Sequence, residues 1–218
     1  RAHLAEGPPI EARFVLLATG ILDLMPDMAA LFDAVQRGII RTCPICDAFE
    51  VIDHRIAVLG HGAHAAREAL FLRTYSPDIT VLSLGIPPEL PAGEQDRLAA
   101  AGIRWLDSPV VDLVEEPGRI VMLRLADGGE HRFDTVYSAL GIAPRNQPVR
   151  DIGAAFDGDG RLLAGDHQET GVPGLYAAGD IVSGLNQISV AMGQAAVAAT
   201  AIHNRLRSPQ AAGAASKA

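Results

Sequence analysis

The residues with the clearest chemical potential are Cys43 and Cys46, which enclose the motif Cys-Pro-Ile-Cys. Two thiols at this spacing can form and break a reversible disulfide, and a helix that begins there would stabilise a thiolate. The chain has only these 2 cysteines, so it lacks the second pair that a zinc site of the usual kind needs. We predict redox chemistry and no metal, while a zinc site and a structural disulfide remain the alternatives.

Asp47 directly follows the second cysteine. A carboxylate at this position could donate or accept a proton during thiol–disulfide exchange. It could equally be an exposed carboxylate that caps a helix. The local sequence is compatible with both roles.

A second motif is the turn Gly-His-Gly-Ala-His-Ala at residues 60–65. Gly60 allows a tight turn, Gly62 lets the backbone approach a pyrophosphate, and Ala65 permits close packing of a helix on a strand. An apolar run precedes the turn and a helical pattern follows it, which is the context of a dinucleotide site. A glycine turn with a purely structural role is the alternative.

The end of the next expected strand does not complete a nicotinamide site. An acid there would bind the ribose of NAD, and an arginine would bind the 2′-phosphate of NADP. Residues 82–88 are Leu-Ser-Leu-Gly-Ile-Pro-Pro and contain neither. The sequence therefore leaves the use of a nicotinamide cofactor open.

A third motif is Gly-Leu-Tyr-Ala-Ala-Gly-Asp at residues 174–180. Asp180 would lie at the carboxyl end of a strand, where it could accept a hydrogen bond from a ribityl or ribose hydroxyl. Gln187 and Ile188 open a long Ala-rich helix whose N–H groups could face a flavin carbonyl. An ordinary strand–turn–helix connection remains the alternative.

The elements that must position these motifs predict an α/β fold. The expected strands cover residues 13–17, 55–59, 79–84, 103–106, 119–125, 131–139 and 175–178. The expected helices cover residues 31–37, 66–75, 94–101 and 188–206. The order strand, turn, helix, strand over residues 55–84 is a βαβ unit and implies a parallel sheet. Asp-Gly-Gly at residues 127–129 predicts a hairpin and thus a small antiparallel meander.

Composition excludes several classes of function. The formal net charge is −8, and no basic run offsets it, so we expect no nucleic-acid partner. Residues 190–202 form an apolar stretch that is too short to span a bilayer, and no signal peptide is evident, so we expect no membrane partner and a cytoplasmic location. Residues 208–218 are small and polar, and we expect a disordered tail.

Together, Ala-Thr-Gly at residues 18–20, the cysteine motif, the glycine turn, Gly141 and residues 174–180 resemble the thioredoxin reductase-like FAD-dependent pyridine nucleotide-disulfide oxidoreductases. The resemblance implies two Rossmann-like dinucleotide-binding domains in three layers of helices and sheet, with the nicotinamide domain inserted into the FAD domain, in a homodimer. Residues 1–23 would end the first FAD segment, 24–144 would form the nicotinamide domain with the cysteine pair, and 145–207 would form the second FAD segment.

The resemblance also implies a role for each motif residue. Cys43 would attack the partner disulfide, Cys46 would lie nearer the flavin, and Asp47 would be the acid/base. The residues that would contact the nicotinamide pyrophosphate are Gly60, Gly62 and Ala65. The residues expected around the flavin and its domain connections are Thr19, Gly20, Gly141, Gly179, Asp180, Gln187 and Ile188.

Three departures from the family pattern affect these expectations. The first FAD-binding glycine fingerprint has no counterpart, so we expect a chain that lacks its N-terminal portion and holds FAD poorly. The arginine pair for the 2′-phosphate is absent from residues 82–88. Ala48 replaces a common glycine, and Asn186 replaces an arginine before Gln187.

The leading hypothesis is a flavoenzyme that passes electrons from NAD(P)H through FAD to the cysteine pair, and then to a thioredoxin-like protein or a small disulfide. In a second hypothesis, electrons pass in the opposite direction. The same cysteine pair oxidises a small dithiol, and oxygen reoxidises the flavin without nicotinamide. The hypothesis that involves no enzyme is a redox-sensing module that binds a flavin or nucleotide.

Overall fold

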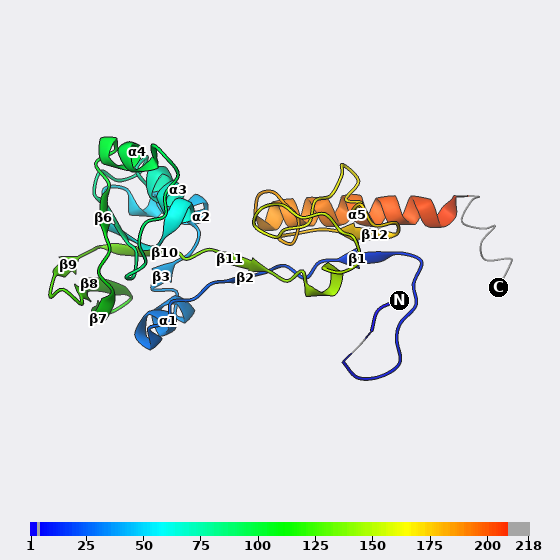
Figure 1. The fold of residues 1–218 in the computed structure, drawn as a ribbon, viewed down its shortest axis with the longest axis horizontal. Coiled ribbons are helices and arrows are strands. Elements are labelled where there is room, and N and C mark those ends of the chain that lie inside the picture. Colours follow the sequence, from blue (N-terminus) through cyan, green and yellow to red (C-terminus); the bar gives the residue numbers. More distant parts are fainter. Residues whose placement is uncertain (4, 209–218) are drawn as a thin grey trace. The chain divides into compact units, whose positions relative to one another are not determined.

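The computed structural model describes residues 1–3 and 5–208 and divides into two compact units, residues 1–22 with 142–218 and residues 23–141 (Figure 1). Apart from Ser208, the expected disordered tail lies outside the described residues. The chain passes between the units along a two-stranded ribbon of β2 (Ile21–Asp23) and β11 (Ile142–Pro144). The second unit ends at Gly141, and residues 142–144 pair with β2.

The second unit is built on a five-stranded parallel sheet. Its strands, in spatial order, are β3 (Ile40–Arg41), β10 (Thr135–Ala139), β4 (Ile56–Gly60), β5 (Ile79–Leu82) and β6 (Arg104–Leu106). Every residue of β4, β5 and β10 is buried. A parallel sheet with such continuous apolar strands must be covered on both faces.

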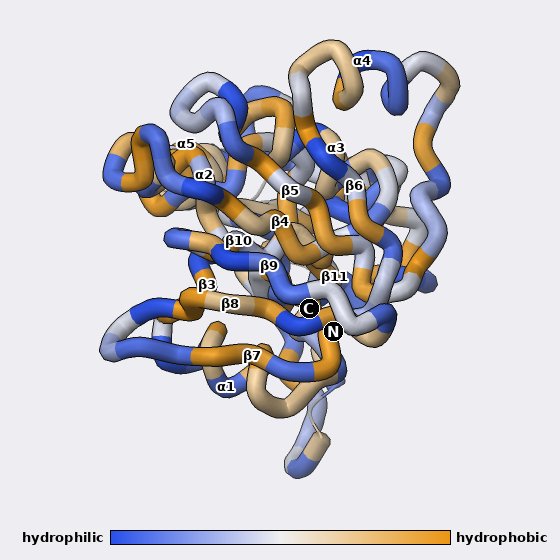
Figure 2. Tube along the Cα trace, turned by 90° about the vertical axis from the view of Figure 1, so that its left-hand side faces the viewer, coloured by the Kyte–Doolittle hydropathy of each residue, from blue (hydrophilic) through white to orange (hydrophobic). Residues whose placement is uncertain are grey.

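Side chains alternate along β4 and enter two different cores. Ile56 and Val58 pack in the core beneath α3 (Gly62–Leu72) and α4 (Glu94–Ala100). Ala57 and Leu59 point the other way, against α1 (Ala29–Gln36) and an antiparallel meander. The strands of the meander are β7 (Val110–Glu116), β8 (Arg119–Leu125) and β9 (Glu130–Arg132). Figure 2 shows the apolar segments of β4 and β5 between α3 and the β7–β8 hairpin. The expected three-layer α/β fold is confirmed.

Two expected elements differ from the structure. The strand expected over residues 131–139 is two strands, β9 in the meander and β10 in the parallel sheet. The break occurs because Phe133 turns into the core while Asp134 accepts hydrogen bonds from Arg55, the residue before β4. Helix α3 begins at Gly62 and not at Ala66, so that only the extended residue His61 separates it from β4, and Gly62 adopts a positive φ of 62° that its lack of a side chain permits.

The first unit has fewer regular elements. Strand β1 (Val15–Leu17) pairs in parallel with β12 (Leu175–Ala177), and the long helix α5 (Ile188–Arg207) follows. Residues 145–174 are mainly turns, with a short 3-10 helix η2 (Gln147–Val149). The core contains Leu17, Val149, Leu162, Leu175, Ala177, Ile181 and Val182. In the described part of the chain, no helix has the length and apolar character needed to cross a membrane.

Candidate active site

Cys43 and Cys46 form a disulfide with 5.3 Å between their Cα atoms. Cys43 immediately precedes the short helix α2 (Pro44–Asp47), and Pro44 suits the first helical position because it has no N–H to satisfy. Cys43 is half-buried and Cys46 is exposed. Because α2 has only 4 residues, its dipole adds less to thiolate stability than the sequence suggested. The described residues contain no group of His, Cys, Asp and Glu that could hold a metal ion.

The carboxylate of Asp47 has a defined partner on each oxygen. Oδ1 accepts a 2.6 Å hydrogen bond from the hydroxyl of Tyr137, and Oδ2 lies 2.6 Å from Nη1 of Arg41. Arg41 belongs to β3 and Tyr137 to β10, and the two residues are direct neighbours across the parallel pair. Asp47 makes no capping hydrogen bond to the 3-10 helix η1 (Ala48–Val51) that it precedes. The sheet, and not α2, therefore holds this side chain.

The two partners of Asp47 keep their protons. Burial and the hydrogen bond to Asp47 raise the pKa of Tyr137 above its usual range, so its hydroxyl remains a donor. Partial burial lowers the pKa of Arg41, but hydrogen bonds to Glu50 and Asp47 outweigh it and raise that pKa overall. Neither residue belongs to a sequence motif that indicated the site. The available signal was a tyrosine among the small and aliphatic residues Thr-Val-Tyr-Ser-Ala at the end of the expected strand 131–139.

A cavity of about 570 Å³ lies beside the disulfide. This volume is in the range of small-molecule sites. Cys43, Arg41 and Asp47 contribute to its wall, so the exchange centre opens onto a space within the second unit. The other lining residues are Asp23, Met25, Val35, Gln36, Gly38, Ile40 and Thr42.

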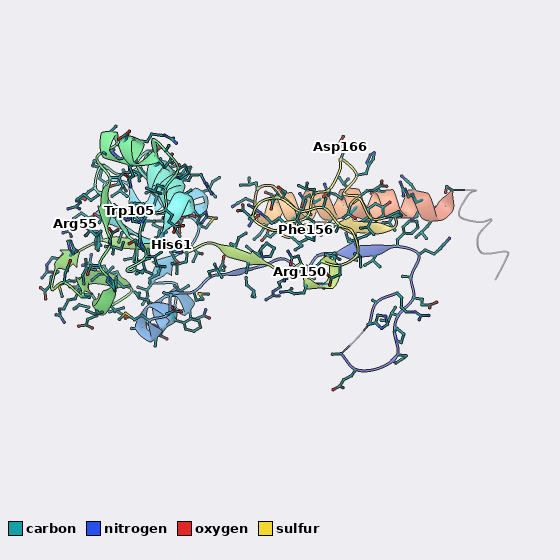
Figure 3. All side chains as sticks on the ribbon, in the orientation of Figure 1. Arg55, His61, Trp105, Arg150, Phe156 and Asp166 are labelled. Carbon is teal, nitrogen blue, oxygen red and sulfur yellow. A yellow bond between two sulfur atoms is a disulfide. The ribbon has the colours of Figure 1, made fainter. Side chains whose placement is uncertain are left out.

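The glycine turn joins β4 to α3 as expected. Gly60 lies opposite Ala139, and Ala65 is fully buried on the inner face of α3. His61, labelled in Figure 3, precedes α3, and no side chain caps the first turn of that helix. Uncapped N–H groups at the start of an 11-residue helix fit a pyrophosphate.

The end of β5 offers no cation to a nucleotide. The hydroxyl of Ser83 donates to Asp107 at 3.2 Å. Residues 84–88 add only apolar side chains and a glycine. The turn thus fits a dinucleotide backbone, whereas the strand end does not fit the 2′-phosphate that distinguishes NADPH.

The residues expected near a flavin gather where β12 meets α5, in the first unit. Gly179 adopts a positive φ of 80°, and its N–H donates to Oε1 of Gln194 at 2.8 Å. Asp180 is half-buried in the same turn. Gln187 precedes α5 and Ile188 begins it, 81% exposed, with no side-chain cap on the first turn. This helix start fits a flavin carbonyl or phosphate group.

Hydrogen bonds beside the β2–β11 ribbon involve three of the expected residues, Thr19, Gly20 and Gly141. The hydroxyl of Thr19 donates to the carbonyl of Arg145 at 2.7 Å, and the carbonyl of Gly20 accepts from the Arg145 N–H. The Gly141 carbonyl accepts from the N–H of Leu24 at 2.9 Å. The bonds to Arg145 stabilise the end of the ribbon in the first unit, and the bond between Gly141 and Leu24 stabilises its end in the second unit.

Comparisons with known proteins agree with these motifs. Residues 2–195 match the model of the pyridine nucleotide-disulphide oxidoreductases. The thioredoxin reductase of Bacillus subtilis strain 168 is 27% identical over 89% of this chain and 63% of its own length. That of Listeria monocytogenes is 25% identical over 86% of this chain and 61% of its own length. This chain therefore spans less than two thirds of these curated relatives.

Solved structures show the same likeness. The crystal structure of HlmI superposes with a TM-score of 0.79 at 29% identity, covering 93% of this chain and 63% of that one. The thioredoxin reductase of Streptococcus pyogenes gives a TM-score of 0.75 at 25% identity, covering 93% of this chain and 68% of that one. The atypical thioredoxin reductase TRi from Desulfovibrio vulgaris Hildenborough gives a TM-score of 0.55 at 31% identity, covering 89% of this chain and 65% of that one.

Proposed function

This chain belongs to the pyridine nucleotide-disulphide oxidoreductase family, and on that basis we propose that it is a flavin-dependent thiol–disulfide oxidoreductase whose exchange centre is Cys43 and Cys46. One observation carries the proposal. The disulfide lies next in sequence to a carboxylate, Asp47, which Arg41 and Tyr137 hold at the same cavity. A purely structural disulfide would need neither the cavity nor the held carboxylate.

The thioredoxin reductase family uses FAD and NAD(P)H. FAD, when bound, would exchange two electrons with the disulfide. Gly179 and Asp180 would hold it, together with the start of α5 at Gln187 and Ile188. The glycine turn with Gly60, Gly62 and Ala65 would accommodate a nicotinamide pyrophosphate.

Two electrons and two protons convert the disulfide into two thiols. The Cys43 thiolate then attacks one sulfur of the substrate disulfide, forms a mixed disulfide and expels a substrate thiolate, which takes up a proton. Cys46, as thiolate, attacks Cys43, re-forms the original bond and releases the second substrate thiolate. Asp47 would donate and accept the protons of these steps. The substrate would be a thioredoxin-like protein or a small disulfide, and the working unit a homodimer.

Replacement of Cys46 by serine tests the proposal in the full chain supplied with FAD and a reduced nicotinamide. The variant can still form a mixed disulfide through Cys43 but cannot resolve it, so multiple turnover of a disulfide substrate should stop. Absorbance of a chromogenic disulfide, followed beyond one equivalent, measures the loss. Steady turnover by Cys46→Ser would refute this assignment.

The end of β5 favours a second function, oxidation of a small dithiol with oxygen as the final acceptor. The hydroxyl of Ser83 donates a hydrogen bond to Asp107, and residues 82–88 contain no basic side chain for a 2′-phosphate. Rapid anaerobic mixing separates the two functions. Fast bleaching of the flavin by NADH or NADPH supports the reductase, whereas bleaching only by a dithiol supports the oxidase.

A further inference from the structure

We propose that Arg41 and Tyr137 are positioning residues, which hold the carboxylate of Asp47 in the orientation that serves the Cys43–Cys46 pair. The inference rests on the proposed role of Asp47 as acid/base. It assigns the orientation of that group to two residues outside the cysteine motif, on strands of the parallel sheet.

Each partner engages one carboxylate oxygen. Tyr137 donates to Oδ1 and Arg41 lies against Oδ2, both at 2.6 Å. A carboxylate oxygen can accept two hydrogen bonds, so each oxygen keeps one position at which a thiol proton can be taken or released. Two fixed donors on different oxygens also set the plane of the carboxylate.

The rigidity comes from the sheet. Helix α2 has 4 residues and could not by itself fix a side chain at its end. Arg41 and Tyr137, by contrast, are paired neighbours on β3 and β10, so the pairing sets the spacing of their backbones. The aromatic ring of Tyr137 is fully buried in the core beneath α3. Its hydroxyl donates to Asp47 and also interacts with the neighbouring Arg41.

Arg41 has its own support. Its Nη1 also donates to Oε2 of Glu50 at 2.9 Å, and Glu50 belongs to η1, which directly follows Asp47. Burial lowers the pKa of Arg41, but the hydrogen bonds to Glu50 and Asp47 outweigh it, so the guanidinium stays charged. The guanidinium thus bridges α2 and η1 to β3.

A phenylalanine at position 137 would fill the same apolar space without burying a hydroxyl. Packing alone therefore does not account for the tyrosine. The chain offers a control in the first unit, Tyr176, another buried tyrosine that donates to a carboxylate paired with an arginine, although both contacts there fall on the same oxygen. It is fully buried and donates to Glu169 at 2.9 Å, and Glu169 pairs with Arg205 at 2.7 Å.

The test measures how fast dithiothreitol opens the disulfide in the full chain, with thiols trapped by alkylation and counted by mass spectrometry. This assay needs no cofactor. Tyr137→Phe and Arg41→Gln should each slow opening by about tenfold, less than the roughly 10²–10⁴-fold that complete loss of acid–base catalysis would cost, because Asp47 itself remains. Arg41→Lys, which keeps the charge, should recover part of the rate. Tyr176→Phe should open within about twofold of the parent rate.

A double variant distinguishes positioning from a structural role. If Tyr137 acts through Asp47, Tyr137→Phe should cause no further slowing in an Asp47→Asn background. Equal slowing in both backgrounds overturns the inference. So does an unchanged rate in Tyr137→Phe when Asp47→Asn alone is slow. An unchanged rate in Asp47→Asn would instead refute the proposed acid/base role, and the inference with it.

Discussion

Replacement of Gly60 by alanine would place a methyl group against the backbone of the neighbouring strand. Gly60 ends β4 directly opposite Ala139 of β10. The added Cβ would lie 2.3 Å from the carbonyl oxygen of Ala139 and 2.8 Å from its carbonyl carbon. It would also lie 3.1 Å from Cβ of Ala65. The closest atoms are backbone atoms of a central strand, so they cannot move without disturbing the pairing of β4 with β10.

The expected cost follows from these distances. Non-bonded carbon contacts are most favourable at about 3.5–4.0 Å, so the 2.8 Å contact with the carbonyl carbon would be at least about 0.7 Å too short. Added methyl groups that force backbone shifts in a packed core cost about 1–3 kcal/mol, occasionally more. We expect Gly60→Ala to lower the free energy of unfolding of the second unit by about 3 kcal/mol.

The chain contains a single tryptophan, which makes the assay specific to one unit. Trp105 lies on β6, in the second unit (Figure 3). Its fluorescence during urea unfolding therefore reports on the sheet that Gly60 belongs to. With a slope of about 2 kcal/mol per molar urea, the midpoint should fall by about 1.5 M.

Gly193→Ala is the control, because an added Cβ there has no neighbour within 4 Å and lies on α5 in the first unit. It should leave the Trp105 transition unchanged. A Gly60→Ala transition within about 0.5 kcal/mol of the parent would refute the steric argument. If the prediction holds, weaker nucleotide binding by Gly60→Ala cannot be taken as proof of a nucleotide contact, because the substitution alters the sheet itself.

Gly193→Ala and two further substitutions probe stability. Gly193→Ala should stabilise α5 by up to about 1 kcal/mol, and a helix signal that melts no later would contradict this. Asn146→Ala should destabilise the first unit by about 1–3 kcal/mol, because buried Asn146 donates to the Gly160 carbonyl at 2.7 Å; an unchanged melting curve would be evidence against it. The hydrogen bond from Arg55 lowers the pKa of Asp134, so its stabilisation is present above the ordinary aspartate pKa and is lost as the pH falls. Asp134→Asn should therefore lose less stability than the parent between about pH 6 and pH 3 in urea unfolding, and equal losses would contradict the pairing.

Local patterns made the βαβ unit predictable. The apolar run before Gly60, the small residues of the turn and the helical pattern after it are all contained in residues 55–82. Each step depends on neighbours in sequence: a buried strand needs continuous apolar residues, and the turn needs glycine. The Cys-Pro-Ile-Cys motif was found for the same reason, because its chemistry depends on a spacing within one turn of chain.

Other features depend on pairing between distant segments and were not predictable. Strand β3 has 2 residues, too few for any periodic pattern. The segment 131–139 was expected to be one strand, but it divides between two sheets, because Phe133 enters the core and Asp134 binds Arg55. Strand β7 was also missed, since it is stabilised by its pairing with β8 and not by a strong pattern of its own.

The sequence by itself determined the chemical groups: two thiols, an adjacent carboxylate and two helix starts suited to phosphate or flavin. Only the tertiary structure decided which side chains hold the carboxylate. Arg41 and Tyr137 are 96 positions apart in the chain (137 − 41), and they meet because β3 and β10 are neighbours in the parallel sheet. Strand order arises from the packing of all layers at once, so no local pattern around Asp47 could indicate its partners.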